Sequence, residues 1–166
     1  MLDCILAAFV LVGPGDQTGT LTFTKPAAWT DRAVASSMRV AEFVVPKTSG
    51  DSEDAEVIVY YFAGGGGSVD ANLQRWTTQF QSTKDPVRTT ATVNGLKLTT
   101  LDVSGTYVAE MRPGSAEHYN KPGYRMRATV VETPKGPYFI KLTGPARTVD
   151  GSGAAFDQFL RSLAFK

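Results

Sequence analysis

The fold is decided by the stretch from Glu56 to Phe80, which reads EVIVYYFAGGGGSVDANLQRWTTQF. Its first part, Glu56 to Phe62, is apolar at both alternating sets of positions, which is typical of a central strand covered on both faces. After the glycines, apolar residues recur at steps of four, three and four, as in an amphipathic helix. These residues are Val69, Leu73, Trp76 and Phe80. The stretch therefore predicts a buried strand and a helix that packs on the sheet.

The glycine run between them, Gly64 to Gly67, raises the question of phosphate binding. A phosphate-binding loop needs a lysine and a hydroxyl at fixed offsets, but Ser68 follows Gly67 directly and the next lysine is Lys84. The contiguous glycines do not fit G-x-G-x-x-G either, and Asp70 in the first helical turn would repel an anion. We interpret the run as a turn with Ser68 as the helix N-cap, with a flexible lid as the alternative.

Two strand-like segments precede this stretch. The first, Gly19 to Thr24, alternates threonine with apolar residues, and the second runs from Met38 to Pro46. In the second, we expect Ala41, Phe43 and Val45 on one face, with Arg39 on that same face near the rim. The polar link at 47–54, KTSGDSED, predicts an exposed hairpin loop.

Beyond residue 80, turn signals separate further strands. Asn94-Gly95 lies between threonine- and valine-rich runs, and residues 134–137 separate Tyr124–Thr133 from Tyr138–Thr143, so both predict hairpins. A last helix is predicted from an apolar stripe, with Thr148, Asp150 or Ser152 as its cap. The stripe is Ala155, Phe156, Phe159, Leu160 and Leu163. The fold class is therefore α+β, a mainly antiparallel sheet of about six or seven strands flanked by helices.

Length and the N-terminal sequence indicate the domain organisation. A chain of 166 residues predicts one domain, over residues 18–166, preceded by a signal-like or disordered segment at 1–17. Ile5 to Val12 is too short to span a bilayer and resembles the h-region of a secretory signal, although no lysine or arginine precedes it and no A-x-A site follows. A misassigned start or a buried first strand are the alternatives. We expect an exported protein, periplasmic or extracellular.

Composition excludes several kinds of partner. Lys plus Arg number 17 against 16 Asp plus Glu, so no overall field favours nucleic acid or an anionic membrane surface. The single cysteine, Cys4, excludes disulfides within the chain and any multi-cysteine metal site. We expect no nucleic-acid partner, no integral membrane span, no metal and no cofactor, and a monomer.

Two loops supply the candidate binding residues. His118, the only histidine, lies beside Tyr119 in the loop at 111–123, where it could bind a ligand or shuttle a proton. One histidine without a second ligand makes a poor zinc site, and the sequence has no G-x-S-x-G nucleophile elbow. We therefore assign no catalytic residue. The candidates for binding a ligand or partner are Gly65, Gly66, Ser68, His118 and Tyr119.

Several motifs resemble the PsbP-like superfamily. An early F-x-x-P-x-x-W is formed by Phe23, Pro26 and Trp29. A late hairpin with Val130, Val131, Gly136 and Tyr138 leads to a terminal helix that ends in Phe159, Leu160, Ser162 and Leu163. The resemblance covers most of residues 19–166 in the order of elements. The segment from Met38 to Phe80 also resembles uncharacterised exported bacterial members.

The resemblance implies an antiparallel sheet flanked by helices and a non-catalytic role. Relatives include lumenal subunits that assist photosystem II and a nuclear import factor that binds the GTPase Ran, but no functional residue can be transferred from either. We expect an exported accessory or binding protein that acts through loops 64–68 and 111–123, with an unknown protein or small ligand as partner. The alternative is a small-molecule-binding protein or weak hydrolase with a pocket near His118.

Overall fold

The computed structural model describes residues 19–166, so the signal-like segment at 1–17 and Cys4 lie outside the described residues. The elements are β1 (Leu21–Thr22), β2 (Thr30–Arg32), β3 (Arg39–Val45), β4 (Ala55–Tyr61), α1 (Val69–Thr77), β5 (Phe80–Gln81), β6 (Val87–Val93), β7 (Leu96–Tyr107), β8 (Lys121–Glu132), β9 (Tyr138–Pro145), α2 (Ala146–Gly151), α3 (Gly153–Arg161) and β10 (Ala164–Phe165).

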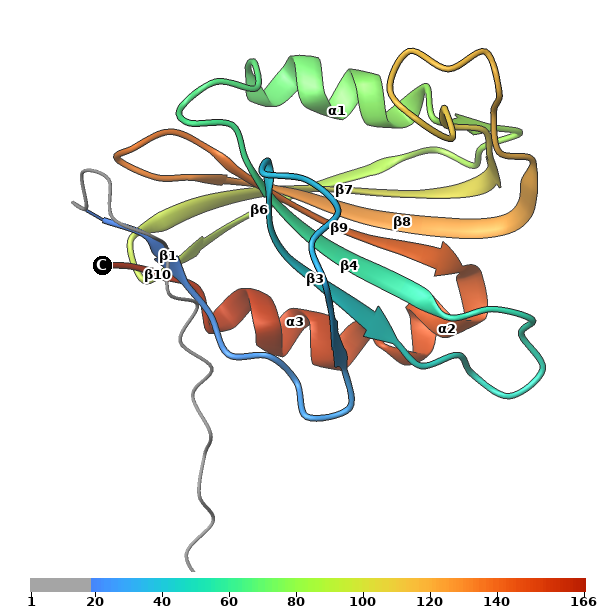
Figure 1. The fold of residues 1–166 in the computed structure, drawn as a ribbon, viewed down its shortest axis with the longest axis horizontal. Coiled ribbons are helices and arrows are strands. Elements are labelled where there is room, and N and C mark those ends of the chain that lie inside the picture. Colours follow the sequence, from blue (N-terminus) through green and yellow to red (C-terminus); the bar gives the residue numbers. More distant parts are fainter. Residues whose placement is uncertain (1–18) are drawn as a thin grey trace, which may run out of the picture.

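Eight of the strands form one antiparallel sheet. Its order is β2-β3-β4-β9-β8-β7-β5, and β6 also pairs with β7. Helix α1 lies on one face, here called the α1 face, and α3 lies on the other, the α3 face (Figure 1). The predicted α+β fold class is confirmed, and the short edge strands β2 and β5 bring the strand number of the sheet to eight.

The α3 face holds the larger part of the core. Phe156 and Phe159 of α3 are fully buried against residues of β3, β4, β7 and β9. Phe159 also contacts Phe23 and Trp29 of the N-terminal segment, with ring centroids 5.1 and 5.3 Å away. Both aromatic residues of the early motif therefore serve as core.

The α1 face is covered by the helix that follows the glycine run. Leu73 and Trp76 are buried against apolar residues of β7, β8 and β9, as the spacing predicts. The helix ends at Thr77, however, and Phe80 lies on β5. Phe80 still joins the same core cluster, because β5 pairs with the far end of β7 and directs its side chain inward.

Three other expectations need correction. The strand predicted at 19–24 shortens to β1 and pairs with β10 in a separate two-stranded sheet. In β3 the register shifts between Arg39 and Ala41, so Arg39 lies opposite Tyr60 and shares the α1 face with Glu42. The bulge adds one residue and turns Arg39 away from the face of Ala41. At α3, Ser152 is the N-cap by position, but its side chain makes no capping hydrogen bond.

All three predicted hairpins are present, including the solvent-facing loop at 47–54 between the antiparallel strands β3 and β4. Asn94 and Gly95 have φ of +47° and +78°, which is the pattern of the tight turn that this dipeptide favours, and they join β6 to β7. Residues 133–137 join β8 to β9. These turns fix the register of the central strands that carry both cores.

Phe159 is the residue whose loss should most weaken the α3 face. We expect Phe159→Ala to lower the free energy of unfolding by about 3 to 5 kcal/mol, because the cavity would lie among aromatic rings that cannot collapse into it. Urea titration measures the change. Gln158→Ala, on the exposed side of the same helix, should change it by less than about 0.5 kcal/mol. Similar losses for both variants would contradict this account of the core.

Candidate functional site

Gly65, Gly66 and Ser68 lie at the N-terminal end of α1. The hydrogen bonds of Gly66 and Ser68 there go to residues of the helix itself. The Ser68 hydroxyl accepts a hydrogen bond from the amide of Ala71 at 3.2 Å, as an N-cap does. The Asn72 side-chain amide donates to the carbonyl oxygens of Gly66 and Ser68, each at 2.8 Å. Gly66 has φ of +105°, and a Cβ there would lie 2.6 Å from the Phe139 ring. The run acts as the predicted turn, and ligand binding by these residues stays a prediction.

His118 and Tyr119 lie at the other end of α1, in the loop between β7 and β8 (Figure 1). His118 is exposed, and its Nδ1 lies 2.8 Å from the carbonyl oxygen of Val108. The loop is held across its neck by a bridge between Glu110 and His118 and by the bond from the Tyr119 amide to the Ala109 carbonyl oxygen, at 2.9 Å. The structure brings His118 and Tyr119 together but places the glycine run at the opposite end of the helix.

Tyr119 belongs to a row of three stacked rings, Tyr119, Tyr107 and Tyr124, here called the tyrosine cluster. The centroid of Tyr107 lies 5.6 Å from that of Tyr119 and 5.9 Å from that of Tyr124, with interplanar angles of 22° and 12°. The Lys121 ammonium lies 5.6 Å from the Tyr119 centroid and 5.4 Å from the Tyr124 centroid. Such cation–π and stacking contacts hold the rings in fixed positions.

The electrostatics of the tyrosine cluster favour a neutral surface. Lys121 Nζ donates to Glu53 Oε2 at 2.6 Å, and this hydrogen bond lowers the pKa of Glu53. Burial raises the pKa of both Tyr107 and Tyr124, so their hydroxyls stay protonated at physiological pH. Tyr124 is buried, so the cluster presents the half-buried rings of Tyr107 and Tyr119, with its one cation already paired.

A buried ion-pair network lies on the α1 face, centred on Glu42 of β3. The Glu42 carboxylate is buried and accepts hydrogen bonds from the Ala35 amide at 2.7 Å, Arg39 at 2.8 Å and Arg32 at 3.1 Å. Burial alone would raise the pKa of Glu42, but these bonds outweigh it and hold the pKa below its ordinary value. Because each of its oxygens is engaged, Glu42 is a structural anion and not a free base.

Lys141 of β9 is a perturbed base on the same face. Its Nζ donates to Gln79 Oε1 at 2.9 Å, and burial, followed by the charge of Arg75, lowers its pKa to about 8. Such an amine could act as a base or nucleophile at mildly alkaline pH. Among the described residues its hydrogen-bond partner is the Gln79 amide, and the charges of Arg75, Glu56 and Arg39 also act on it.

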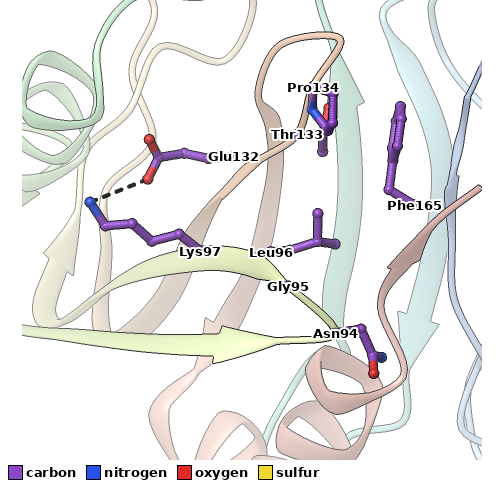
Figure 2. A pocket seen from close by; sticks show the side chains of 8 residues that line it. All are labelled: Asn94, Gly95, Leu96, Lys97, Glu132, Thr133, Pro134 and Phe165. Atoms are coloured by element: carbon purple, nitrogen blue, oxygen red, sulfur yellow. Dashed lines mark ion pairs between the residues drawn. The ribbon is translucent and has the colours of Figure 1, made fainter.

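Among the hollows on the described surface are two that are not lined by His118. The larger, about 470 Å³, is an open depression between the β6–β7 and β8–β9 turns (Figure 2). Lys97 and Glu132 form an ion pair of 3.5 Å at one side, and Phe165 stands at the other. The smaller, about 160 Å³, lies beside β2 and β3.

No group of three or more histidine, cysteine, aspartate or glutamate side chains in residues 19–166 could hold a metal ion. Over the same range, no helix is long and apolar enough to cross a membrane.

Two features of the site were missed by sequence reasoning. The tyrosine cluster joins residues from β7, the loop and β8, and nothing local in the sequence links Tyr107 to Tyr124. Lys141 did leave a signal, because it is a lone lysine within the apolar strand YFIKLT. A charged residue in a central strand indicates either a polar patch on one face or a shifted pKa.

Lys141 should make stability depend on pH. Below about pH 8 the amine is protonated in the folded chain and costs stability, whereas between pH 8 and its ordinary pKa of 10.5 only the unfolded state keeps the proton. The free energy of unfolding should therefore rise over this range by roughly 1 to 3 kcal/mol more in the wild type than in Lys141→Met. Urea titrations at each pH measure the difference. Lys97→Met, at an exposed lysine of the α1 face, should follow the wild type. Parallel wild-type and Lys141→Met profiles would show that the pKa is not lowered.

Comparison with known proteins supports the fold. No protein-family model matches the chain, and no curated protein matches it. Solved structures that share its architecture include PA94, a protein of unknown function from Pseudomonas aeruginosa, with a TM-score of 0.54 over 87% of this chain and 96% of that chain at 18% identity. The cyanobacterial PsbP protein, CyanoP, from Synechocystis sp. PCC 6803 superposes with a TM-score of 0.53 over 97% of this chain and 99% of that chain at 14% identity. At these identities the likeness shows the fold alone, and that fold is PsbP-like.

Proposed function

We propose that this chain is an exported, non-catalytic accessory protein of the PsbP-like superfamily that binds another protein. Its binding surface is the outer side of α1 together with the loops at both ends of that helix, 64–68 and 111–123. The observation that carries the proposal is the tyrosine cluster beside the second loop, in which the half-buried Tyr119 and Tyr107 stack in a row on the buried Tyr124, since partly exposed tyrosines on a rigid base are typical of protein-binding surfaces.

The loop at 111–123 is held in shape before any partner binds. The Met111 amide donates to the Glu117 carbonyl oxygen at 2.9 Å, and the Gly114 amide donates to Glu110 Oε2 at 2.7 Å. Met111 is nevertheless 47% exposed, and His118 is exposed beside it. A preformed loop with exposed apolar and aromatic side chains loses less entropy on binding than a disordered one.

The spacing of the two loops suits one interface. Helix α1 has nine residues, which gives a length of about 14 Å. A standard interface buries roughly 800 Å² per partner, a patch roughly 30 Å across, so one partner could contact both loops. Between the loops the outer side of α1 is exposed and polar. Its exposed residues are Asp70, Ala71, Gln74, Arg75 and Thr78.

Catalysis has less support from the site. His118 Nδ1 donates to the Val108 carbonyl oxygen, whereas the perturbed Lys141 of β9 donates to Gln79, so the two side chains have different hydrogen-bond partners. Neither hollow contains His118. A small-molecule or hydrolase site at His118 would need a pocket there, and we therefore prefer the binding role.

Tyr119 should be the most informative residue for binding. We expect Tyr119→Ala with His118→Ala to reduce retention of the partner at least tenfold in pull-downs from source-cell envelope extracts, because truncating an interface tyrosine commonly costs more than about 1 kcal/mol. Gln158→Ala on α3, on the opposite side of the sheet, is the matched control. Circular dichroism should show the same fold for all variants. A partner list unchanged in the double variant would reject this surface.

Export can be checked independently of binding. We expect the full chain, expressed in its source cells, to be recovered from the envelope or medium with a mass below that of the 17.8 kDa chain, because a secretory signal is removed. Fractionation and intact-mass measurement decide this. Recovery of the full-length chain in the cytoplasm would reject export while leaving the binding surface to be tested.

A further inference from the structure

The outer edge of β6 is an open position in the sheet. All seven residues of β6 pair with β7 in unbroken register, and within the part of the chain that the structure describes β6 pairs with no other strand. Six of the seven side chains of β6 are exposed, whichever face of the sheet they point to, and Val87 is 55% exposed. The backbone groups along this edge can therefore pair with an incoming strand.

The opposite edge of the sheet lacks these properties. Strand β2 has three residues, and two of them are Asp31 and Arg32. Both charges are engaged, since Asp31 pairs with Lys25 and Arg32 with Glu42 and Glu56. Short, charged edge strands resist pairing with other chains. By contrast β6 reads VRTTATV, with neither proline nor lysine nor glycine, and it is rich in residues that favour strands.

From this contrast we infer that β6 is a homodimer interface, at which β6 of a second copy adds antiparallel across a two-fold axis at Thr90. This inference is independent of the binding surface on α1.

The sequence of β6 fits a second copy. With Thr90 on the axis, Val87 lies opposite Val93, Arg88 opposite Thr92 and Thr89 opposite Ala91. Each pair lies on one face, because residues directly opposite in antiparallel strands point the same way. The α3 face then gains an apolar row from both copies, with Val87, Ala91 and Val93.

Charge also permits this pairing. Arg88 is the one charged residue of β6, and its guanidinium already lies 2.7 Å from Asp70 of the same copy. No like charges meet in the proposed register. The interface is one strand wide and lies at the small end of the range for specific complexes, so we expect a dissociation constant in the micromolar range.

The test uses the full chain and sedimentation at concentrations from about 1 to 200 µM, a range that spans the micromolar dissociation constant expected for such a small interface. We expect the wild type to move from about 17.8 kDa to about twice that mass. Thr90→Lys should weaken dimerisation at least tenfold, because two lysines would face each other on the axis. Thr30→Lys puts the same charge on β2 and should leave dimerisation unchanged. Circular dichroism checks that each variant folds.

Mixing variants separates the register from a general loss of association. Thr90→Glu alone should also fail to dimerise, whereas an equimolar mixture with Thr90→Lys should form heterodimers, since opposite charges then meet at the axis. A wild type that stays monomeric across the concentration range would overturn the inference. So would equal weakening by Thr90→Lys and Thr30→Lys, or a mixture that stays monomeric when the wild type dimerises.

Discussion

The constraint on which the rest of the structure depends is the width of the sheet relative to one helix. Seven strands along the main path span about 29 Å, whereas a helix with its side chains is about 10 to 12 Å wide. On the α3 face, Phe23 and Trp29 from the N-terminal segment extend the apolar cover beyond α3. On the α1 face, helix α1 packs over apolar residues of β7, β8 and β9, and the charged residues Glu42 of β3 and Lys141 of β9 lie on the same face. There the buried Glu42 is paired with Arg39 and Arg32, and the Lys141 amine donates to Gln79.

The sequence predicted those parts of the fold that local patterns determine. Leu73 and Trp76 follow the period of a helix, and Asn94-Gly95 determines its turn through backbone conformations that few other residues adopt. The errors arose where tertiary pairing overrides local pattern. Phe80 continues the helical spacing, yet pairing with Tyr107 extends that part of the chain as β5. At Arg39 a bulge, which leaves no mark in the alternation of apolar residues, changes the face of the side chain.

The candidate site was predicted less completely, for the same reason. The loop with His118 and Tyr119 was found because it interrupts two strands, but its neighbours Tyr107 and Tyr124 come from strands where aromatic residues look like ordinary core. The two predicted loops are close in neither sequence nor space. They lie at opposite ends of α1, and this helix sets the distance between them. A surface of this kind depends on where the sheet places the two ends of α1, which no local pattern encodes.

The proposed dimer leaves the proposed binding surface of each copy accessible, so one dimer would carry two binding surfaces. A two-fold axis perpendicular to the sheet keeps both α1 helices on one side of the joined sheet. Asp70 at the start of α1 contacts Arg88 of β6, whereas the tyrosine cluster lies at the far end of β7. The antiparallel copies would therefore direct their tyrosine clusters toward opposite ends of the joined sheet. Two such surfaces on one side can bind a repeated or dimeric partner with an avidity above either single affinity, so a micromolar dimer could still bind a multivalent partner tightly.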